Sequence, residues 1–261
     1  MLERVRHDDV TLIEARTGAV ACAFTERTGG VSAPPYASLN LGSHVGDDPA
    51  AVRENRRRVL AALGAEDLLD RLLVPNQVHG DHVAVVRSAD VAALGAARSE
   101  LADGADAVVC LAPDVPVLLC YADCVPVVIA CPRGFAVVHS GWRGTLARIG
   151  ASAARVLARE TGCDPAGFAA FIGPHILADE YEVSEELIAD FTAAFGAGVC
   201  AGPRLLDLSF AIRAALREAG VPDASVLDPQ LSTVRSNDRF FSFRAEHGVC
   251  GRHAAVAVMR G

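Results

Sequence analysis

The chain of 261 residues contains no lysine, and all 24 of its basic residues are arginine. This absence excludes a Schiff-base lysine, a lysine general base and the lysine of a phosphate-binding loop. Any contact with a phosphate group must therefore come from arginine, from backbone N–H groups or from a metal ion.

The sequence also has no long uninterrupted hydrophobic run, although 51% of its residues are hydrophobic. The longest apolar stretch, residues 115–138, is interrupted by prolines and charged residues. No uninterrupted run within it reaches the ~18 residues of a membrane helix. The first nine residues lack the apolar segment of a secretory signal. The net charge of −8 and the lack of a basic tail disfavour general nucleic-acid binding. We expect a cytoplasmic protein with neither a membrane nor a nucleic-acid partner.

Eight cysteines are scattered along the chain without a Cys-x-x-Cys pair. In a chain of this length that lacks a secretory signal, we expect reduced thiols rather than a disulfide framework. Most of them lie in apolar, strand-like runs, where a free cysteine behaves as a small core residue. Cys124 differs, because it follows Asp123 at the expected end of a strand.

Four segments carry the start and stop signals of helices. Asp48-Pro49 begins the first helix and Gly64 ends it, while Ser184 begins the third, which ends near Gly196. The expected helices cover residues 48–63, 145–160, 184–196 and 207–219.

Eight runs rich in β-branched and other apolar residues are expected strands. They cover residues 19–24, 82–87, 107–111, 115–120, 125–131, 135–139, 169–172 and 254–259. The middle runs are continuously apolar, as in strands covered on both faces. Because strands come in consecutive groups, we expect an α+β fold in which mixed β-sheets are flanked by helices. With no internal repeat and no Pro/Gly-rich linker, residues 1–261 are expected to form a single domain.

One short segment concentrates the residues best suited to catalysis. Cys124 precedes the apolar run 125–131, and His139 ends the next run. His79 lies in a polar turn just before another expected strand. As a pair, Cys124 and His139 are typical of a nucleophile and its base. Together with His79 they form a His₂Cys set, which leaves a tetrahedral zinc ion one open position.

The turn that follows adds a potential anion site. Gly141 and Gly144 permit close approach of the backbone, and a helix beginning at Thr145 would direct its free N–H groups to the same edge. Arg143 supplies a guanidinium for an anion. Trp142, the only tryptophan, either stacks on a ring or packs in the core. The segment therefore predicts an oxyanion site beside the metal site.

Motifs spread over nearly the whole chain resemble those of one known family. They are FTERTGGVS (24–32), SLNL (38–41), VRENR (52–56), QVHG (77–80), ADA (105–107), ADCVP (122–126), HSGWRG (139–144), IGP (172–174), YEV (181–183) and FSFR (241–244). The sequence is similar to the YfiH-like family, also called the multicopper polyphenol oxidase or laccase-domain family, whose members act on purine nucleosides.

The resemblance implies a zinc site formed by His79, Cys124 and His139, which matches the set reached from the residues alone. It implies a mixed-sheet α+β fold with helices outside the sheets. It also implies phosphorolysis of adenosine, inosine, guanosine and methylthioadenosine, together with deamination of adenosine. Purine nucleosides and phosphate would then be the partners.

Further polar residues are expected to assist this chemistry. Arg27 and Arg244 would join Arg143 in neutralising the phosphate, and Asn40 would contact a ribose hydroxyl. Asp106 or Asp123 would orient a ligand histidine or transfer a proton. The alternative for both carboxylates is to cap a turn.

Two positions depart from the family pattern. His175 follows Gly-Pro where the family often has a cysteine, and Ser232-Thr233 replaces a common Cys-Thr pair. Neither position belongs to the inferred zinc set. His175 is expected to add a polar group at the mouth of the site.

Three other functions remain open. A metal-free Cys–His hydrolase would use Cys124 as nucleophile and His139 as base, which suits an amidase that edits peptidoglycan precursors. A copper oxidase is disfavoured, because a blue-copper site usually adds an axial methionine and only Met1 and Met259 are present. The eight histidines also include no His-x-His pair. A non-enzymatic binding module would have no need for three potential metal ligands.

Overall fold

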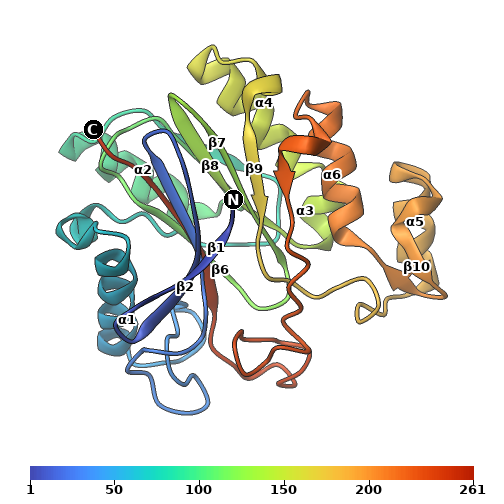
Figure 1. Cartoon of the computed structure of the whole chain (residues 1–261), viewed down its shortest axis with the longest axis horizontal. Helices are drawn as coiled ribbons and strands as arrows, with labels where there is room; N and C mark the ends of the chain where they lie inside the picture. Colours follow the sequence, from blue (N-terminus) through green and yellow to red (C-terminus); the bar gives the residue numbers. More distant parts are fainter.

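Two large β-sheets pack face to face in the computed structural model, which describes residues 1–261 (Figure 1). The first sheet is antiparallel and has the strand order β1 (Glu3–His7), β2 (Val10–Thr17), β3 (Val20–Thr25), β13 (His253–Met259) and β6 (Val117–Tyr121). The second has the order β12 (Val226–Leu227), β9 (Ala169–Ile172), β7 (Val125–Cys131), β8 (Gly134–Ser140), β5 (Ala107–Cys110) and β4 (Val83–Val86). Its inner pairs are antiparallel and its two edge pairs are parallel, so it is a mixed sheet.

An apolar core to which both sheets contribute holds them together. Phe24 and Tyr121 from the first sheet and Phe135 and Val137 from the second are at most 1% exposed and belong to one buried cluster. Successive side chains of a strand point to opposite faces, so the same strands also contribute to two outer clusters. Burial on both faces explains why the central strands are continuously apolar.

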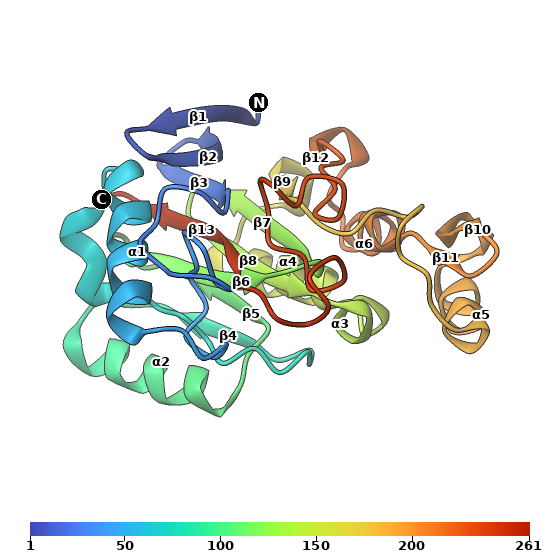
Figure 2. The same ribbon diagram turned by 90° about the horizontal axis from the view of Figure 1, so that it is seen from below.

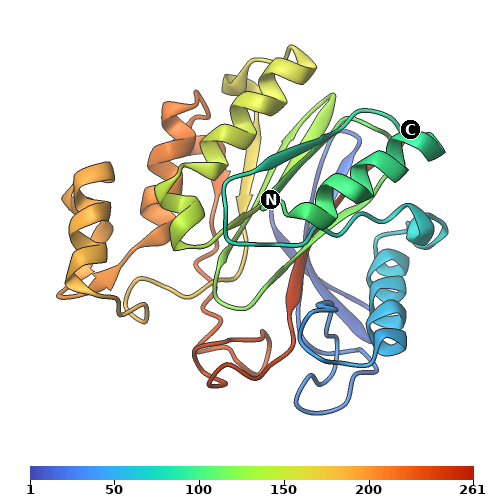
Figure 3. The same cartoon turned by 180° about the vertical axis from the view of Figure 1, so that it is seen from behind.

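Helices cover the outer faces of the sheets. α1 (Pro49–Ala62) packs with the 3₁₀ helix η1 (Glu66–Arg71) on the first sheet. α4 (Ile149–Thr161) and α6 (Leu208–Glu218) pack on the second sheet, and α2 (Val91–Asp103) contacts its edge strand β4 (Figure 3). α5 (Glu185–Phe195) and the hairpin of β10 (Cys200–Gly202) and β11 (Leu205–Leu206) project at one end of the molecule (Figure 2). Three further 3₁₀ helices are η2 (Pro165–Gly167), η3 (Ala197–Val199) and η4 (Asp223–Ser225). No helix combines the length and the apolar character needed to span a membrane.

The predicted α+β class with flanking helices is confirmed. The helix starts at Asp48, Ser184 and Asp207 are confirmed as well, because each side chain accepts a hydrogen bond from a backbone N–H of the first turn. The prediction of a single helix over residues 145–160 is wrong, because two helices occupy this region. The first is α3 (Trp142–Leu146), the second is α4, and the chain between them turns at Arg148, whose φ is 59°.

The sequence analysis did not predict α2, β1 or β2. α2 is capped by Asp90, whose side chain accepts from Ala93 N–H, but its apolar residues are mostly alanine and give a weak helical periodicity. β1 is polar and largely exposed, because it is the edge strand of its sheet. β1 has no buried residue and α2 has only two large ones, so neither shows a clear period. In β2 the first four residues are all buried, which hides the alternation of a strand.

Asn55 of α1 anchors the long segment between β3 and α1, residues 26–48. Its side chain is fully buried, and its Oδ1 accepts a hydrogen bond from Val31 N–H at 2.9 Å. Its Nδ2 donates to the backbone oxygens of Ser38 and Asn40 at 3.1 and 2.9 Å. One amide therefore fixes the course of a segment that contains neither a helix nor a strand.

Replacing Asn55 with alanine should lower the free energy of unfolding by roughly 2–4 kcal/mol, because it strands several buried backbone groups without partners. The matched control is Arg53→Ala on the same helix, whose exposed ion pair with Asp70 should change stability by less than about 1 kcal/mol. Urea denaturation of both variants measures the difference. Equal losses would show that Asn55 is not an anchor.

Candidate metal centre and adjoining cavity

The three predicted metal ligands meet at one edge of the six-stranded sheet. Cys124 directly precedes β7, and His139 lies near the end of β8, opposite Pro126 in the antiparallel register of the two strands. His79 lies in the turn before β4, which is separated from β8 only by β5. One donor atom from each of the three side chains lies within 4.8 Å of the other two. The fold therefore brings the expected His₂Cys set together.

A buried carboxylate orients two of these ligands. Asp106 is fully buried, and its Oδ1 accepts hydrogen bonds from Nδ1 of His139 at 2.7 Å and from the N–H of His79 at 3.0 Å. Its Oδ2 accepts from the N–H groups of Val78 and Gly80 at 3.1 and 2.7 Å. With Nδ1 of His139 committed to Asp106, Nε2 is the nitrogen left for a metal. The same contacts hold His79 in a left-handed conformation with φ of 58°.

The buried charges of this site support one another. Burial raises the pKa of the Cys124 thiol, but the charge and hydrogen bonds of His139 and His79 outweigh this effect and lower the pKa to about 6. Burial lowers the pKa of His139, but the Cys124 thiolate and the hydrogen bond to Asp106 outweigh it and raise the pKa to about 9. Burial likewise raises the pKa of Asp106, and the hydrogen bond from His139 brings it below its usual value. A thiolate, the form that binds metals, is thus stable near neutral pH.

Gly141 keeps the space between the ligands open. A Cβ atom at this position would lie 3.1 Å from Sγ of Cys124 and 3.2 Å from Cδ2 of His79. Ligand atoms around a tetrahedral zinc ion are roughly 3.3–3.8 Å apart, given Zn–N and Zn–S bonds of about 2.0–2.3 Å. A methyl group would therefore press on Sγ of Cys124 and on the ring of His79, so glycine leaves the three side chains the space to approach one small ion.

The ligand set opens into a cavity of about 510 Å³. Besides the three ligands, it is lined by His44, Gln77, Cys120, Tyr121, Ala122, Asp123, Trp142, Ile176, Tyr181, Phe243, Arg244 and Arg252. Aromatic rings and cationic side chains thus surround the site. Such a lining suits a flat ring system joined to polar or anionic groups.

Among the other predicted site residues, Asp123, Trp142 and Arg244 line this cavity. Oδ1 of Asp123 accepts a hydrogen bond from the hydroxyl of Thr233 at 2.6 Å, and Oδ2 accepts from the N–H of Arg244 at 2.7 Å. Asp123 therefore ties the turn that carries Cys124 to the loop that carries Arg244. The Arg244 guanidinium lies 5.5 Å from the centre of the Tyr181 ring.

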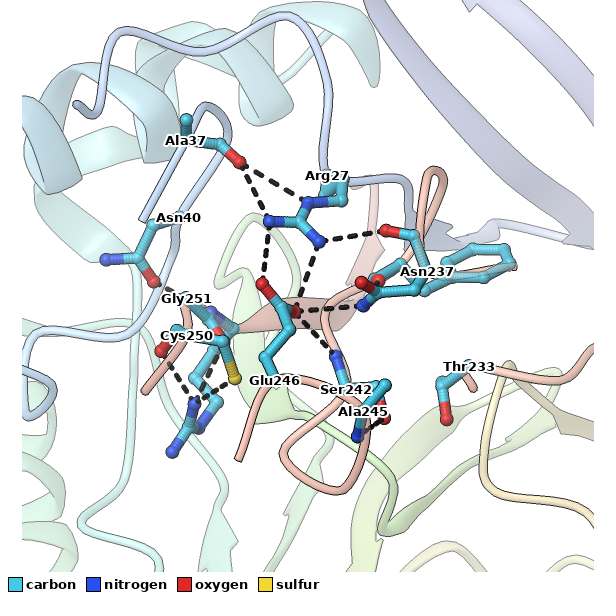
Figure 4. A network of polar contacts seen from close by, with 12 residues as sticks. Arg27, Ala37, Asn40, Thr233, Asn237, Ser242, Ala245, Glu246, Cys250 and Gly251 are labelled. Carbon is cyan, nitrogen blue, oxygen red and sulfur yellow. Dashed lines mark hydrogen bonds and ion pairs between the residues drawn. The ribbon is translucent and has the colours of Figure 1, made fainter. Parts of the chain in front are cut away.

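Arg27 does not line the cavity, and its guanidinium is held in a polar network around Glu246 (Figure 4). It donates to both carboxylate oxygens of Glu246 at 3.1 Å and to the backbone oxygens of Ala37 and Asn237. Glu246 in turn accepts from the N–H of Ser242 at 3.1 Å. Arg27 therefore joins the segment after β3 to the loop before β13 rather than contacting a ligand of the cavity.

Asn40 and Arg143 also lie outside the cavity lining. Asn40 is fully buried, and its Oδ1 accepts hydrogen bonds from the N–H groups of Gly42 and Arg252 at 3.1 and 2.8 Å. Arg143 is exposed, and its guanidinium stacks 4.2 Å from the Trp142 ring centre. The structure therefore does not bring these two side chains to the ligand set.

The expectation for His175 is wrong. This side chain is 1% exposed, and its Nδ1 contacts the backbone oxygen of Gly173 at 2.8 Å. A backbone β-bridge pairs His175 with Ser232, and His175 is not part of the cavity lining.

The sequence analysis missed several residues of the cavity wall. Gln77, two residues before His79, pairs with the backbone of Cys120 through both ends of its amide at 2.8 Å. The QVHG motif (77–80), which places Gln77 near His79, could have indicated this residue. His44 and Arg252 carry no such signal, because only the tertiary structure brings a loop before α1 beside the start of β13.

Comparison with known proteins agrees with this fold. The family described as multi-copper polyphenol oxidoreductase laccase matches residues 21–260. A purine nucleoside phosphorylase from Deinococcus radiodurans is 40% identical over 251 residues, which cover 94% of this chain and 91% of that protein. One from Mycobacterium tuberculosis is 35% identical, with coverage of 99% and 100%.

Solved structures give the same result. YlmD from Geobacillus stearothermophilus has a TM-score of 0.87 at 28% identity and covers 100% of this chain and 99% of its own. The hypothetical protein YfiH from Bacillus licheniformis has a TM-score of 0.86 at 30% identity, and 97% of each chain is covered. The family match over most of the chain and these relatives show that the protein belongs to the YfiH-like family, the multi-copper polyphenol oxidoreductase laccase family.

Proposed function

We propose that this protein is a zinc-dependent purine nucleoside phosphorylase that acts on adenosine, inosine, guanosine and methylthioadenosine, and that it also deaminates adenosine. The convergence of His79, Cys124 and His139 at the base of an aromatic and cationic cavity carries the proposal. The names of the relatives support phosphorolysis of purine nucleosides. Zinc and deamination rest on the donor set and on the family resemblance.

The donor set favours zinc over copper. Two imidazoles and one thiolate are common ligands of a catalytic zinc ion, which keeps a fourth position open for a reacting group. A blue-copper site would usually add a methionine, but Met259 is packed in the core between the sheets and Met1 is exposed at the chain start. Zinc, when bound, would supply Lewis-acid polarisation of an oxygen atom.

The residues of the chain position the reactants. In phosphorolysis, a phosphate oxygen forms a bond to the ribose C1′ while the bond from C1′ to the purine nitrogen breaks, and the purine leaves with a proton. In deamination, water adds to C6 of adenine and ammonia leaves. Asp106 keeps a proton on Nδ1 of His139 and so fixes which nitrogen faces the site. Asp123 positions the backbone of Arg244, and the rings of Tyr181 and Phe243 give a purine surfaces for stacking.

Replacing Cys124 with alanine should remove bound zinc and lower the rate of hypoxanthine release from inosine at least about a thousandfold, because the only thiolate ligand is lost. Cys200→Ala, at an exposed thiol, is the matched control and should keep both properties. Elemental analysis and a phosphate-dependent assay of the purified variants measure the two effects. Full activity in a variant without zinc would contradict the metal-dependent mechanism.

Replacing Asp106 with asparagine should weaken zinc affinity by about 10- to 100-fold. The amide cannot accept all four hydrogen bonds, since its NH₂ group would face backbone donors. Competition with a chelator measures the affinity of the variant. Asp81→Asn, in the loop that carries His79, is the control and should leave the zinc affinity unchanged. Equal affinities in wild type and the Asp106 variant would show that this carboxylate does not orient the ligands.

The Cys124–His139 ion pair also supports a second candidate function, a metal-free Cys–His hydrolase. Alkylation of Cys124 by iodoacetamide separates the two. In metal-stripped protein the thiolate exists above its pKa, so labelling should rise with pH around a midpoint near 6, compared with about 8.5 for a free cysteine. Bound zinc should block labelling at every pH. A zinc-loaded protein that loses activity on labelling of Cys124 would favour the hydrolase.

A further inference from the structure

Arg252 is a half-buried cation of the cavity that has no counterion. None of the ion pairs in the structure includes it. Its Nη1 donates to the backbone oxygens of Cys250 and Gly251, both at 2.9 Å, and contacts Sγ of Cys250. Its Nε and Nη2 make no hydrogen bond within the protein. These two atoms form the edge of the guanidinium that binds an oxyanion with two parallel bonds.

Other arginines of the chain show what this edge does when a partner is present. Arg239 directs Nε and Nη2 at one oxygen of Glu26, at 2.9 and 2.6 Å. Arg87 binds the two oxygens of Glu160 with the same pair of atoms, at 2.8 and 2.9 Å. Arg252 presents the same edge to the cavity without a carboxylate, which leaves the edge open to an anion from outside the chain.

Two neighbours hold Arg252 beside His44. Asn40 accepts the backbone N–H of Arg252 and that of Gly42 on a single oxygen, which joins the two loops. Gly42 leaves room for the side chains, since a Cβ there would lie 2.8 Å from Cγ of Arg252 and 3.4 Å from Cε1 of His44. The buried amide of Asn40 thus acts as a positioning group for the pair.

The cavity lining contains two arginines and only one carboxylate. Asp123 is the only acidic residue in its lining, and both of its oxygens accept hydrogen bonds from Thr233 and Arg244. The remaining charged or ionisable residues are three histidines, two cysteines, two tyrosines and the two arginines. In a chain with a net charge of −8, this cavity is therefore a local site for negative charge.

We propose that Arg252, with His44 beside it, is the binding site for a tetrahedral oxyanion, inorganic phosphate, in the cavity that contains the metal ligands. The assignment rests on the proposed phosphorolysis and replaces the sequence-based expectation that Arg143 binds the phosphate. Arg143 is exposed and stacked on Trp142, outside the cavity lining.

Steady-state phosphorolysis of inosine tests the assignment with the variant Arg252→Gln. The KM for phosphate should rise at least tenfold, while the KM for inosine should change less than threefold, because only the anion contact is lost. Arg252→Lys keeps the charge but loses the two-pronged edge, and should give an intermediate KM for phosphate. Arg155→Gln is the charge-matched control, at an exposed α4 residue without an ion pair, and should change neither constant.

Calorimetric titration of phosphate into the purified proteins, without nucleoside, separates this inference from the proposed function. Binding to wild type and to Arg155→Gln, with at least tenfold weaker binding to Arg252→Gln, supports the site even where no nucleoside is turned over. Equal binding by wild type and Arg252→Gln overturns it, even where inosine is phosphorolysed. Should Arg252→Gln fail to fold, Arg252→Lys and His44→Asn replace it, and an unchanged KM for phosphate in both overturns the assignment.

Discussion

The carboxylate of Asp106 is the constraint on which the site depends. It is fully buried and accepts four hydrogen bonds, which join the turn of His79 to the ring of His139. Its backbone oxygen also accepts the N–H of His139 at 2.7 Å, so this histidine is fixed at both its backbone and its ring. A buried charge is stable only when it is satisfied in this way. The hydrogen bonds that satisfy this one buried acid therefore set the geometry of His79 in its turn and of His139 in β8.

The six-stranded sheet and the loops contribute different parts of the cavity. The six-stranded sheet places Cys124 and His139 at its edge through the antiparallel pairing of β7 and β8. β6 and α3 contribute Cys120, Tyr121 and Trp142 to the wall, and the rest comes from loops that depend on buried polar contacts for their shape. Asn55 anchors the loop after β3, and the Arg27–Glu246 pair joins that loop to the one before β13 (Figure 4). The rigid part of the fold thus holds the ligands, and polar networks hold the walls.

Features that depend on local sequence patterns were predictable from the sequence, and features that depend on contacts between distant residues were not. Strands buried on both faces and helices with side-chain caps are local patterns, so β7, β9 and the helix starts at Asp48 and Ser184 were predicted correctly. The meeting of His79, Cys124 and His139 was predictable, because Cys124 precedes and His139 ends two consecutive strands, and His79 lies in the polar turn before a third. The roles of Arg27 and Asn40 were not, since their partners Glu246 and Arg252 are more than two hundred residues away in the sequence. The helix after His139 was misplaced because nothing local indicates the left-handed turn at Arg148.

The position of β13 in its sheet has a consequence for how the protein is made. This strand lies between β3 and β6, and both of those strands leave the ribosome long before it does. Until β13 is synthesised, the apolar edges of β3 and β6 have no partner in the sheet, and open edges of this kind attract other chains. The loop that contains Arg244 and Arg252 precedes β13 directly and is fixed in place only with it. Cavity and sheet are therefore completed together, late in synthesis, so a nascent chain that carries all three metal ligands still lacks a finished site.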